Sequence, residues 1–272
     1  MRVRVALIGN PNVGKSVIFN SLTGMKQHTG NWPGKTVEKK VGYFIHYGVE
    51  FEVIDLPGVY SLSAVSEDEK VARSFIVDHR PDVVVDIVNA SQLERNLYLT
   101  LLLIELQVNL VVALNMYDIV QARGDRIDIE GLSRHLGAPV VSTTATRKEG
   151  IEQLKDAILT SIPLHFLGSS RDEEALEIHT AGDFDDDDHL HYHPRYHHHG
   201  EFELLKPPAI KYSPRVESKL KQLVLILQEE EKDLLDRFPP RWLALKVLER
   251  DPEILSLFED AKNLDRLLEV TL

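Results

Sequence analysis

The chain has 272 residues, a hydrophobic fraction of 43%, a formal net charge of −12 and no cysteine. Its length suits one large domain or two modest ones, and its composition is ordinary for a folded globular protein. The negative charge argues against nonspecific nucleic-acid binding, which needs Lys and Arg against phosphates, and the lack of cysteine excludes disulfides and thiolate metal sites.

The first predicted elements are a buried strand over Val3–Ile8 and a helix over Lys15–Thr23. Strands and helices then alternate to about Pro163, which is typical of a doubly wound α/β domain with a mostly parallel sheet. Gly24–Thr36 is rich in glycine and polar residues, which predicts a mobile loop. The further predicted strands are Val37–Tyr47, Phe51–Asp55, Val83–Val88, Leu110–Leu114 and Val140–Ser142. The further predicted helices are Ser66–Asp78, Leu93–Glu105, Glu130–Leu136 and Gly150–Ile162.

No apolar run reaches the ~18 residues that span a bilayer. The longest candidate, Leu97 to Leu114, is interrupted by polar residues and is interpreted as a helix followed by a buried strand. From Ser213 to Leu272 apolar residues recur at helix spacing, and Pro252 is expected in the first turn of a helix. We therefore predict an α/β domain over residues 1–164 and a smaller all-α domain over residues 165–272, with a polar insert at about 171–206.

The segment between the first strand and helix, Gly9–Ser16, has the pattern Gly, four residues, then Gly-Lys-Ser. A glycine-rich loop that opens a helix presents inward-pointing N–H groups and the positive end of the helix dipole to phosphates. Lys15 is expected to contact the β- and γ-phosphates, and the Ser16 hydroxyl is expected to bind Mg²⁺. The expected nucleotide contacts here are Gly9, Asn10, Pro11, Asn12, Val13, Gly14, Lys15, Ser16 and Val17.

Further short motifs follow in the order expected of a GTPase. The motif Asp55-Leu56-Pro57-Gly58 ends a predicted strand, where Asp55 would hold Mg²⁺ through water and the Gly58 N–H would meet the γ-phosphate. Thr36 can offer its hydroxyl to Mg²⁺ and its N–H to the γ-phosphate. Gly34 and Lys35, which directly precede Thr36, are included among the expected nucleotide contacts.

Two motifs predict which base is bound. Asn115-Met116-Tyr117-Asp118 ends another strand, and the Asp118 carboxylate can accept two hydrogen bonds from the guanine edge, which adenine cannot supply. Asn115 would brace the loops around the base, and Met116 lies between these two residues. The segment Thr144-Ala145-Thr146 follows the last predicted strand, where a backbone N–H can donate to guanine O6.

The residue that promotes hydrolysis is not the glutamine found in many GTPases, because Val59 occupies the position after Gly58. Three alternatives stay open: a nearby polar residue, a water held by the backbone, or a cation. The amide oxygen of Asn12 could hold a monovalent cation that bridges the phosphates. The expected catalytic residues are Asn12, Lys15, Thr36 and Gly58.

These motifs resemble a known family, the ferrous iron transport protein B family. The resemblance rests on Gly30–Glu38, Asp55–Leu62 and Asn115–Asp118, in which Met116 stands where GTPases commonly have Lys, and on Arg241–Lys246. It covers Met1–Ile162 strongly and Ser213–Leu272 moderately. It implies a Ras-like P-loop GTPase domain, followed by an all-α domain likened to a GDP-dissociation inhibitor.

The resemblance also implies GTP and GDP as ligands, Mg²⁺ as cofactor, and slow hydrolysis stimulated by K⁺, with Asn12 matching the family's potassium ligand. The expected partner is a transmembrane region of the same polypeptide that moves Fe²⁺, so we expect a soluble part of a larger membrane protein at the cytoplasmic face of the membrane. Assembly as a dimer or trimer is a further expectation. The alternatives are a free-standing homologue, a soluble GTPase associated with ribosomes or RNA, against which the acidic charge counts, and a non-enzymatic metal-binding protein whose G domain only switches.

The polar insert contains a run of acidic residues followed by a histidine tract. The tract comprises His189, His191, His193, His197, His198 and His199. Histidine and aspartate bind divalent metals, so one hypothesis is a low-affinity metal-collecting or metal-sensing loop; the alternative is a solvated loop without a metal role.

Overall fold

The computed structural model describes residues 2–24, 27–63, 65–162, 210–258 and 261–271. Within these ranges one seven-stranded sheet has the order β2-β3-β4-β1-β5-β6-β7. β2 and β4 each pair antiparallel with β3, and all other neighbours are parallel. The strands are β1 (Arg2–Gly9), β2 (Gln27–Asn31), β3 (Glu38–His46), β4 (Val49–Asp55), β5 (Val83–Asn89), β6 (Leu110–Asn115) and β7 (Val140–Ser142).

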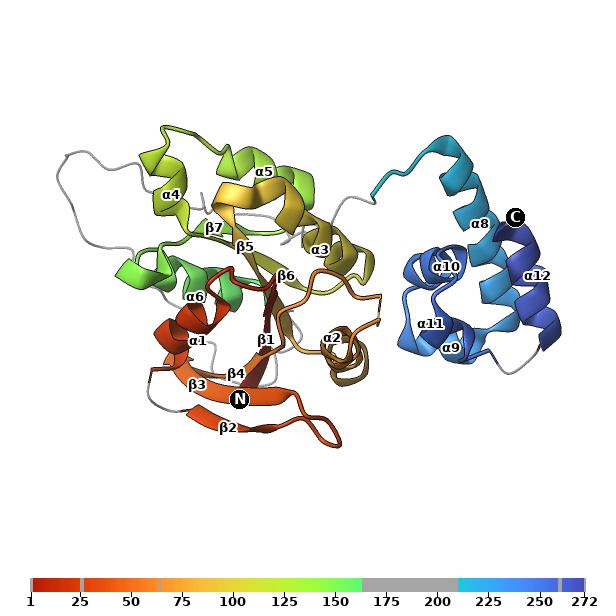
Figure 1. Ribbon diagram of the computed structural model, residues 1–272, viewed down its shortest axis with the longest axis horizontal. Helices are drawn as coiled ribbons and strands as arrows, with labels where there is room; N and C mark the ends of the chain where they lie inside the picture. The colour runs from red at the N-terminus through yellow and green to blue at the C-terminus, as the bar shows by residue number, and fades with distance from the viewer. Residues whose placement is uncertain (1, 25–26, 64, 163–209, 259–260, 272) are drawn as a thin grey trace, which may run out of the picture. The chain divides into compact units, whose positions relative to one another are not determined.

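Helices cover both faces of this sheet, with α1 and α6 on one face and α2 and α3 on the other (Figure 1). The central strands β5 and β6 are buried almost throughout, and their predominantly apolar sequences are typical of strands covered on two faces. The helices are α1 (Lys15–Thr23), α2 (Glu67–His79), α3 (Leu93–Glu105), α4 (Tyr117–Ala122), α5 (Ile129–Leu136) and α6 (Ile151–Thr160), with 3₁₀ turns η1 (Ala90–Gln92) and η2 (Ala145–Arg147).

The part of the chain after residue 210 is helical. Trp242 is fully buried there and stacks on Phe238, with 5.1 Å between ring centroids. Asp251 caps a short helix whose first residue is Pro252, as expected of a proline without an N–H to donate. The helices are α8 (Pro214–Glu230), α9 (Lys232–Arg237), α10 (Pro240–Leu248), α11 (Pro252–Leu255) and α12 (Ala261–Thr271). The predicted fold class is therefore confirmed.

The structure corrects one prediction within the loop over Gly24–Thr36. Residues Gln27–Asn31 form the edge strand β2, which pairs with β3 from Asn31 opposite Glu38 to Gln27 opposite Gly42. All four residues after Gln27 are exposed, so the strand lacks the alternation of apolar and polar side chains that marks a half-buried strand. Helix α4 was also missed, because it is only six residues long and follows a strand directly.

Most other boundaries agree with the predictions to within one or two residues. Lys15–Thr23, Leu93–Glu105 and Val140–Ser142 agree at both ends. The insert at residues 171–206, with its histidine tract, lies outside the described residues. Within the described ranges, no helix combines the length and apolar character needed to cross a membrane.

Candidate nucleotide-binding site

The loop between β1 and α1 has a backbone that its sequence explains. Gly14 adopts φ 86°, a left-handed conformation that glycine takes without steric cost. A Cβ at Gly14 would lie 2.3 Å from Asn115 Nδ2, so no side chain fits there. The Gly14 carbonyl accepts from the Val17 and Ile18 N–H groups at 3.0 and 3.1 Å, which starts α1 directly after the loop.

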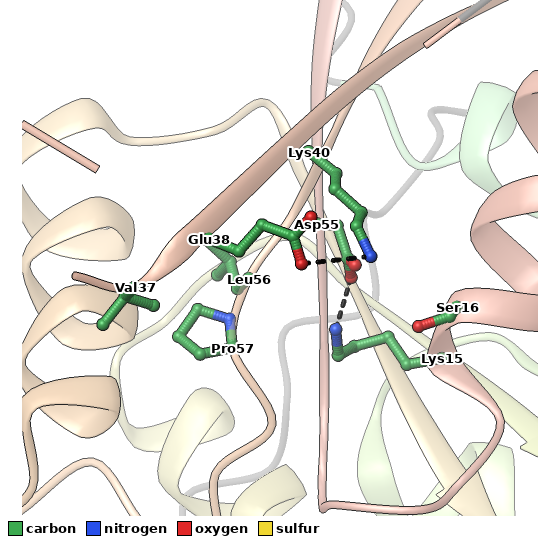
Figure 2. Close-up of a pocket in the computed structure, with 8 residues that line it drawn as sticks. All are labelled: Lys15, Ser16, Val37, Glu38, Lys40, Asp55, Leu56 and Pro57. Carbon is green, nitrogen blue, oxygen red and sulfur yellow. Dashed lines mark hydrogen bonds and ion pairs between the residues drawn. The ribbon is translucent and has the colours of Figure 1, made fainter. Parts of the chain in front are cut away.

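A cavity of about 230 Å³ opens beside this loop. Figure 2 shows Lys15 and Ser16 of α1 on one side of it and Asp55 of β4 close by. Lys15 Nζ donates to Asp55 Oδ1, and both side chains are largely buried. The structure thus brings together three predicted site residues. They meet because β1, which leads through the phosphate loop into α1, pairs with β4, and Leu7 lies opposite Asp55. The cavity is lined by Lys15, Ser16, Val37, Glu38, Lys40, Asp55, Leu56 and Pro57.

The segment after β4 is held against the phosphate loop by its backbone. The Leu56 N–H donates to the Leu7 carbonyl at 3.0 Å, and the Val59 N–H donates to the Gly9 carbonyl at 3.1 Å. A Cβ at Gly58 would lie 3.3 Å from Pro11, so glycine allows this close approach. Val59 is 3% exposed and apolar, so its side chain can neither reach nor orient a water molecule in the cavity.

Asn115 connects two loops through its buried side chain. Its Nδ2 donates to the Val13 carbonyl at 2.9 Å, and its Oδ1 accepts from Thr143 Oγ1 at 3.2 Å and from the Ala145 N–H at 3.1 Å. Asn115 therefore braces the two loops as its position in the motif indicates. To donate to guanine, the Ala145 N–H would have to give up its hydrogen bond to Asn115 Oδ1. Thr143 was not identified from the sequence, because its contribution is a single hydrogen bond from a buried hydroxyl to Asn115.

Asp118 is the second residue of α4, whose N-cap residue Met116 has a left-handed φ of 59°. Its carboxylate is partly exposed and lies 3.8 Å from Arg147 Nη2. The carboxylate is thus open to a ligand at the carboxyl end of β6, the edge where open α/β sheets bind ligands. Arg147, on η2, is a second residue that the sequence pattern did not single out.

Thr36 and Asn12 are among the predicted residues that do not line the cavity. Thr36 is exposed in the turn between β2 and β3, which is closed by a hydrogen bond of 3.0 Å from the Trp32 N–H to the Val37 carbonyl. Asn12 is exposed at φ 66° in the phosphate loop. The cavity is lined instead by Glu38 and Lys40, which were not singled out from the sequence. These residues alternate along a predicted strand that follows Thr36 directly, so both side chains project from the same face of the sheet. That alternation is the signal in the sequence that could have identified them.

The oxygen atoms at the cavity suit Mg²⁺. Ser16 supplies a hydroxyl and Asp55 a carboxylate, and magnesium in nucleotide sites is bound by one or two such oxygens together with substrate phosphates. Because Lys15 neutralises the buried Asp55 carboxylate here, a bound cation would have to replace that ammonium group.

Comparison with family models finds two matches. Residues 3–158 match the model described as ferrous iron transport protein B, and residues 212–271 match the model of the FeoB cytosolic helical domain. The chain is 48% identical over 161 residues to the Fe(2+) transporters FeoB of Salmonella typhimurium strain LT2 and Escherichia coli strain K12. The aligned part is 58% of this chain and 21% of each transporter, so the chain spans about a fifth of the length of these relatives.

Solved structures are also similar to this chain, two of them over its whole length. A point mutant of S. thermophilus NFeoB bound to mGDP has a TM-score of 0.75 and 32% identity, covering 100% of this chain and 89% of that one. The cytosolic domain of the T. maritima FeoB iron transporter in apo form has a TM-score of 0.74 and 31% identity, covering 100% and 96%. The FeoB G-domain of Methanococcus jannaschii is 51% identical with a TM-score of 0.53, covering 59% of this chain and 97% of that one.

Proposed function

The chain belongs to the ferrous iron transport protein B family, and on that premise we propose that it binds and hydrolyses GTP to regulate a ferrous iron transporter. The observation that carries the proposal is the meeting of Lys15, Ser16 and Asp55 at one cavity, with Asn115 bracing the loops beside it. Structures of relatives bound to GDP support guanine nucleotides as the ligands. The transmembrane iron-permeation region of the same polypeptide is the proposed partner, at the cytoplasmic face of the membrane.

The residues of the site have separate proposed roles. Lys15 and the N–H groups of Val13–Ser16 hold the phosphates, and Asn115 and Asp118 select guanine. Ser16, Asp55 and Thr36 would hold Mg²⁺, which supplies positive charge to the phosphate oxygens. Because Thr36 is exposed in a turn outside the cavity, its role requires that turn to move toward the nucleotide. Ordering of a loop by the γ-phosphate is a known way in which GTPases change state.

The proposed route to hydrolysis uses K⁺ held by Asn12, since the buried Val59 side chain cannot orient water. Asn12 lies within the loop that cradles phosphates, and its exposed side chain leaves the amide oxygen free to turn toward a bridging cation. A slow rate is expected, because the position that holds a water-orienting glutamine in many GTPases is apolar here. The domain boundary near residue 164, a dimeric or trimeric assembly and metal binding by His189–His199 remain proposals.

A multiple-turnover phosphate-release assay with GTP tests this function. We expect Mg²⁺-dependent turnover that is faster in K⁺ than in Na⁺, with the difference lost in Asn12→Ala while GDP binding is retained. The matched control is Asn20→Ala, an exposed asparagine of α1 outside the cavity. Absence of turnover in both salts would contradict the enzyme proposal, and equal turnover in both salts would contradict the potassium route alone.

A further inference from the structure

Two lysines line the candidate nucleotide cavity from different elements, and each is paired with a carboxylate of that cavity. Lys15 of α1 pairs with Asp55, and Lys40 of β3 lies 3.4 Å from Glu38 Oε2 (Figure 2). These four side chains carry two positive and two negative charges, which balance. A triphosphate entering the cavity adds negative charge, so it favours release of the lysines from their carboxylates.

The position of Lys40 follows from the register of the sheet. Lys40 of β3 is the direct partner of Asp55 on β4, and direct partners in an antiparallel pair project from the same face. Glu38 lies two residues earlier on that face. Lys39, between them, projects to the other face, where its Nζ lies 4.7 Å from the centre of the Trp32 ring.

The lining of the cavity indicates which end of a nucleotide meets Lys40. The cavity includes Ser16 and the segment Asp55–Pro57, whose roles in the proposed function are at the Mg²⁺ and the γ-phosphate. Asn115 and Asp118, the proposed guanine-selecting residues, do not line it. Lys40 therefore faces the position of the third phosphate.

The ion pair between Lys40 and Glu38 is weak enough for a phosphate to replace Glu38 as the partner of Lys40. The two side chains are 30% and 59% exposed, and exposed ion pairs add little to stability. A phosphate offers several charged acceptor oxygens to the same ammonium group. Lys40 can thus leave Glu38 for a phosphate at small cost.

We propose that Lys40 binds the third phosphate and so favours GTP over GDP, with Glu38 holding it in the absence of that phosphate. Resting on the proposed function, this inference adds a specificity residue to the site. Loss of a charge-assisted hydrogen bond to the third phosphate lowers affinity by about tenfold. The diphosphate lacks the acceptor, so its affinity changes little.

The test is displacement of fluorescent GDP from the full chain, with Mg²⁺ present, by unlabelled GDP and by the non-hydrolysable analogue guanylyl imidodiphosphate. Lys40→Gln should weaken the analogue about tenfold while changing GDP less than about twofold. Lys40→Arg should retain most of the preference, since its side chain keeps the charge. Glu38→Gln should act in the opposite direction and strengthen the analogue.

Lys39→Gln is the matched control, because it removes the same charge from the next residue without altering the cavity lining. Equal analogue affinity in Lys40→Gln and Lys39→Gln would overturn the inference, as would weaker analogue binding in Glu38→Gln. Failure of the wild-type chain to bind either guanine nucleotide would instead overturn the proposed function. GDP binding by each variant reports that it has folded.

Discussion

At the scale of single residues, the proposed selection of guanine rests on Asp118. Its carboxylate is partly exposed at the carboxyl end of β6 and can accept from two donors of guanine. Asparagine at this position accepts one hydrogen bond and donates another, which matches xanthine, where an oxygen replaces the amino group. Asp118→Asn should therefore weaken GDP by at least about a hundredfold and improve binding of xanthosine diphosphate.

Competition of both diphosphates against fluorescent GDP measures this change in base preference. Asp125→Asn, which removes the same charge from an exposed position, should leave the preference for guanine intact. An unaltered preference in Asp118→Asn would show that the base is selected elsewhere.

A second residue, Asp86, predicts how stability depends on pH. It is 1% exposed on β5, accepts from Thr100 Oγ1 at 2.6 Å, and burial raises its pKa to about 7. A carboxyl whose folded pKa lies above its unfolded value stabilises the protein at low pH, and this contribution falls as pH rises from about 4 to about 7. Asp86→Asn cannot ionise and keeps an oxygen to accept from Thr100.

Asp86→Asn should therefore be more stable than the wild-type chain at pH 8, and the difference should disappear toward pH 4. Urea unfolding at several pH values measures this effect. Asp125→Asn serves again as the control, since it alters the same charge at the surface. A mutant that is less stable than the wild type at pH 8 would contradict the assignment of a costly buried charge.

At the scale of elements, α2 has a complete capping box. Ser66 Oγ accepts from the Glu69 N–H at 3.2 Å, and Glu69 Oε2 accepts from the Ser66 N–H at 3.4 Å. Loss of such a cap costs about 1 kcal/mol of free energy of unfolding. Ser66→Ala should show this loss in urea unfolding, whereas Ser74→Ala, an exposed position inside the same helix, should be neutral or stabilising. Equal effects at both positions would mean that the cap contributes nothing.

Elements differ in how far the sequence predicts them. β5 and β6 were predicted to within one residue, because strands buried on both faces are apolar at most positions. β2 was missed because its polar residues pair by backbone hydrogen bonds with β3 and bury almost no side chain. A strand that exists by pairing alone has no periodic signal in its own sequence.

At the scale of the whole chain, Arg73 joins residues that are far apart in sequence. Its Nη1 donates to Asp251 Oδ2 at 2.6 Å and to the Leu62 carbonyl at 3.3 Å, and its Nη2 donates to Glu253. Arg73 and Asp251 are 4% and 5% exposed. Removing one partner of a buried ion pair leaves the other charge uncompensated, so Arg73→Met should cost about 3 kcal/mol or more.

Urea unfolding of the full chain checks this cost. Arg237→Met is the matched control, because its ion pair with Asp78 is roughly half exposed on both sides and should contribute about 1 kcal/mol or less. Similar losses in the two variants would show that the Arg73 contacts are no stronger than a surface pair.

The sequence by itself determined the candidate phosphate loop, the candidate guanine motif and the alternation of strands and helices, because spacing, glycine positions and side-chain periodicity are local properties. The tertiary structure decided which of these residues meet. Lys15 pairs with Asp55 forty positions away, and Asn115 reaches the Val13 carbonyl across 102 positions. Lys40 lies beside Asp55 only because β3 and β4 pair in one register. Such contacts depend on strand order and register, which the pairing of distant segments sets and no local pattern encodes.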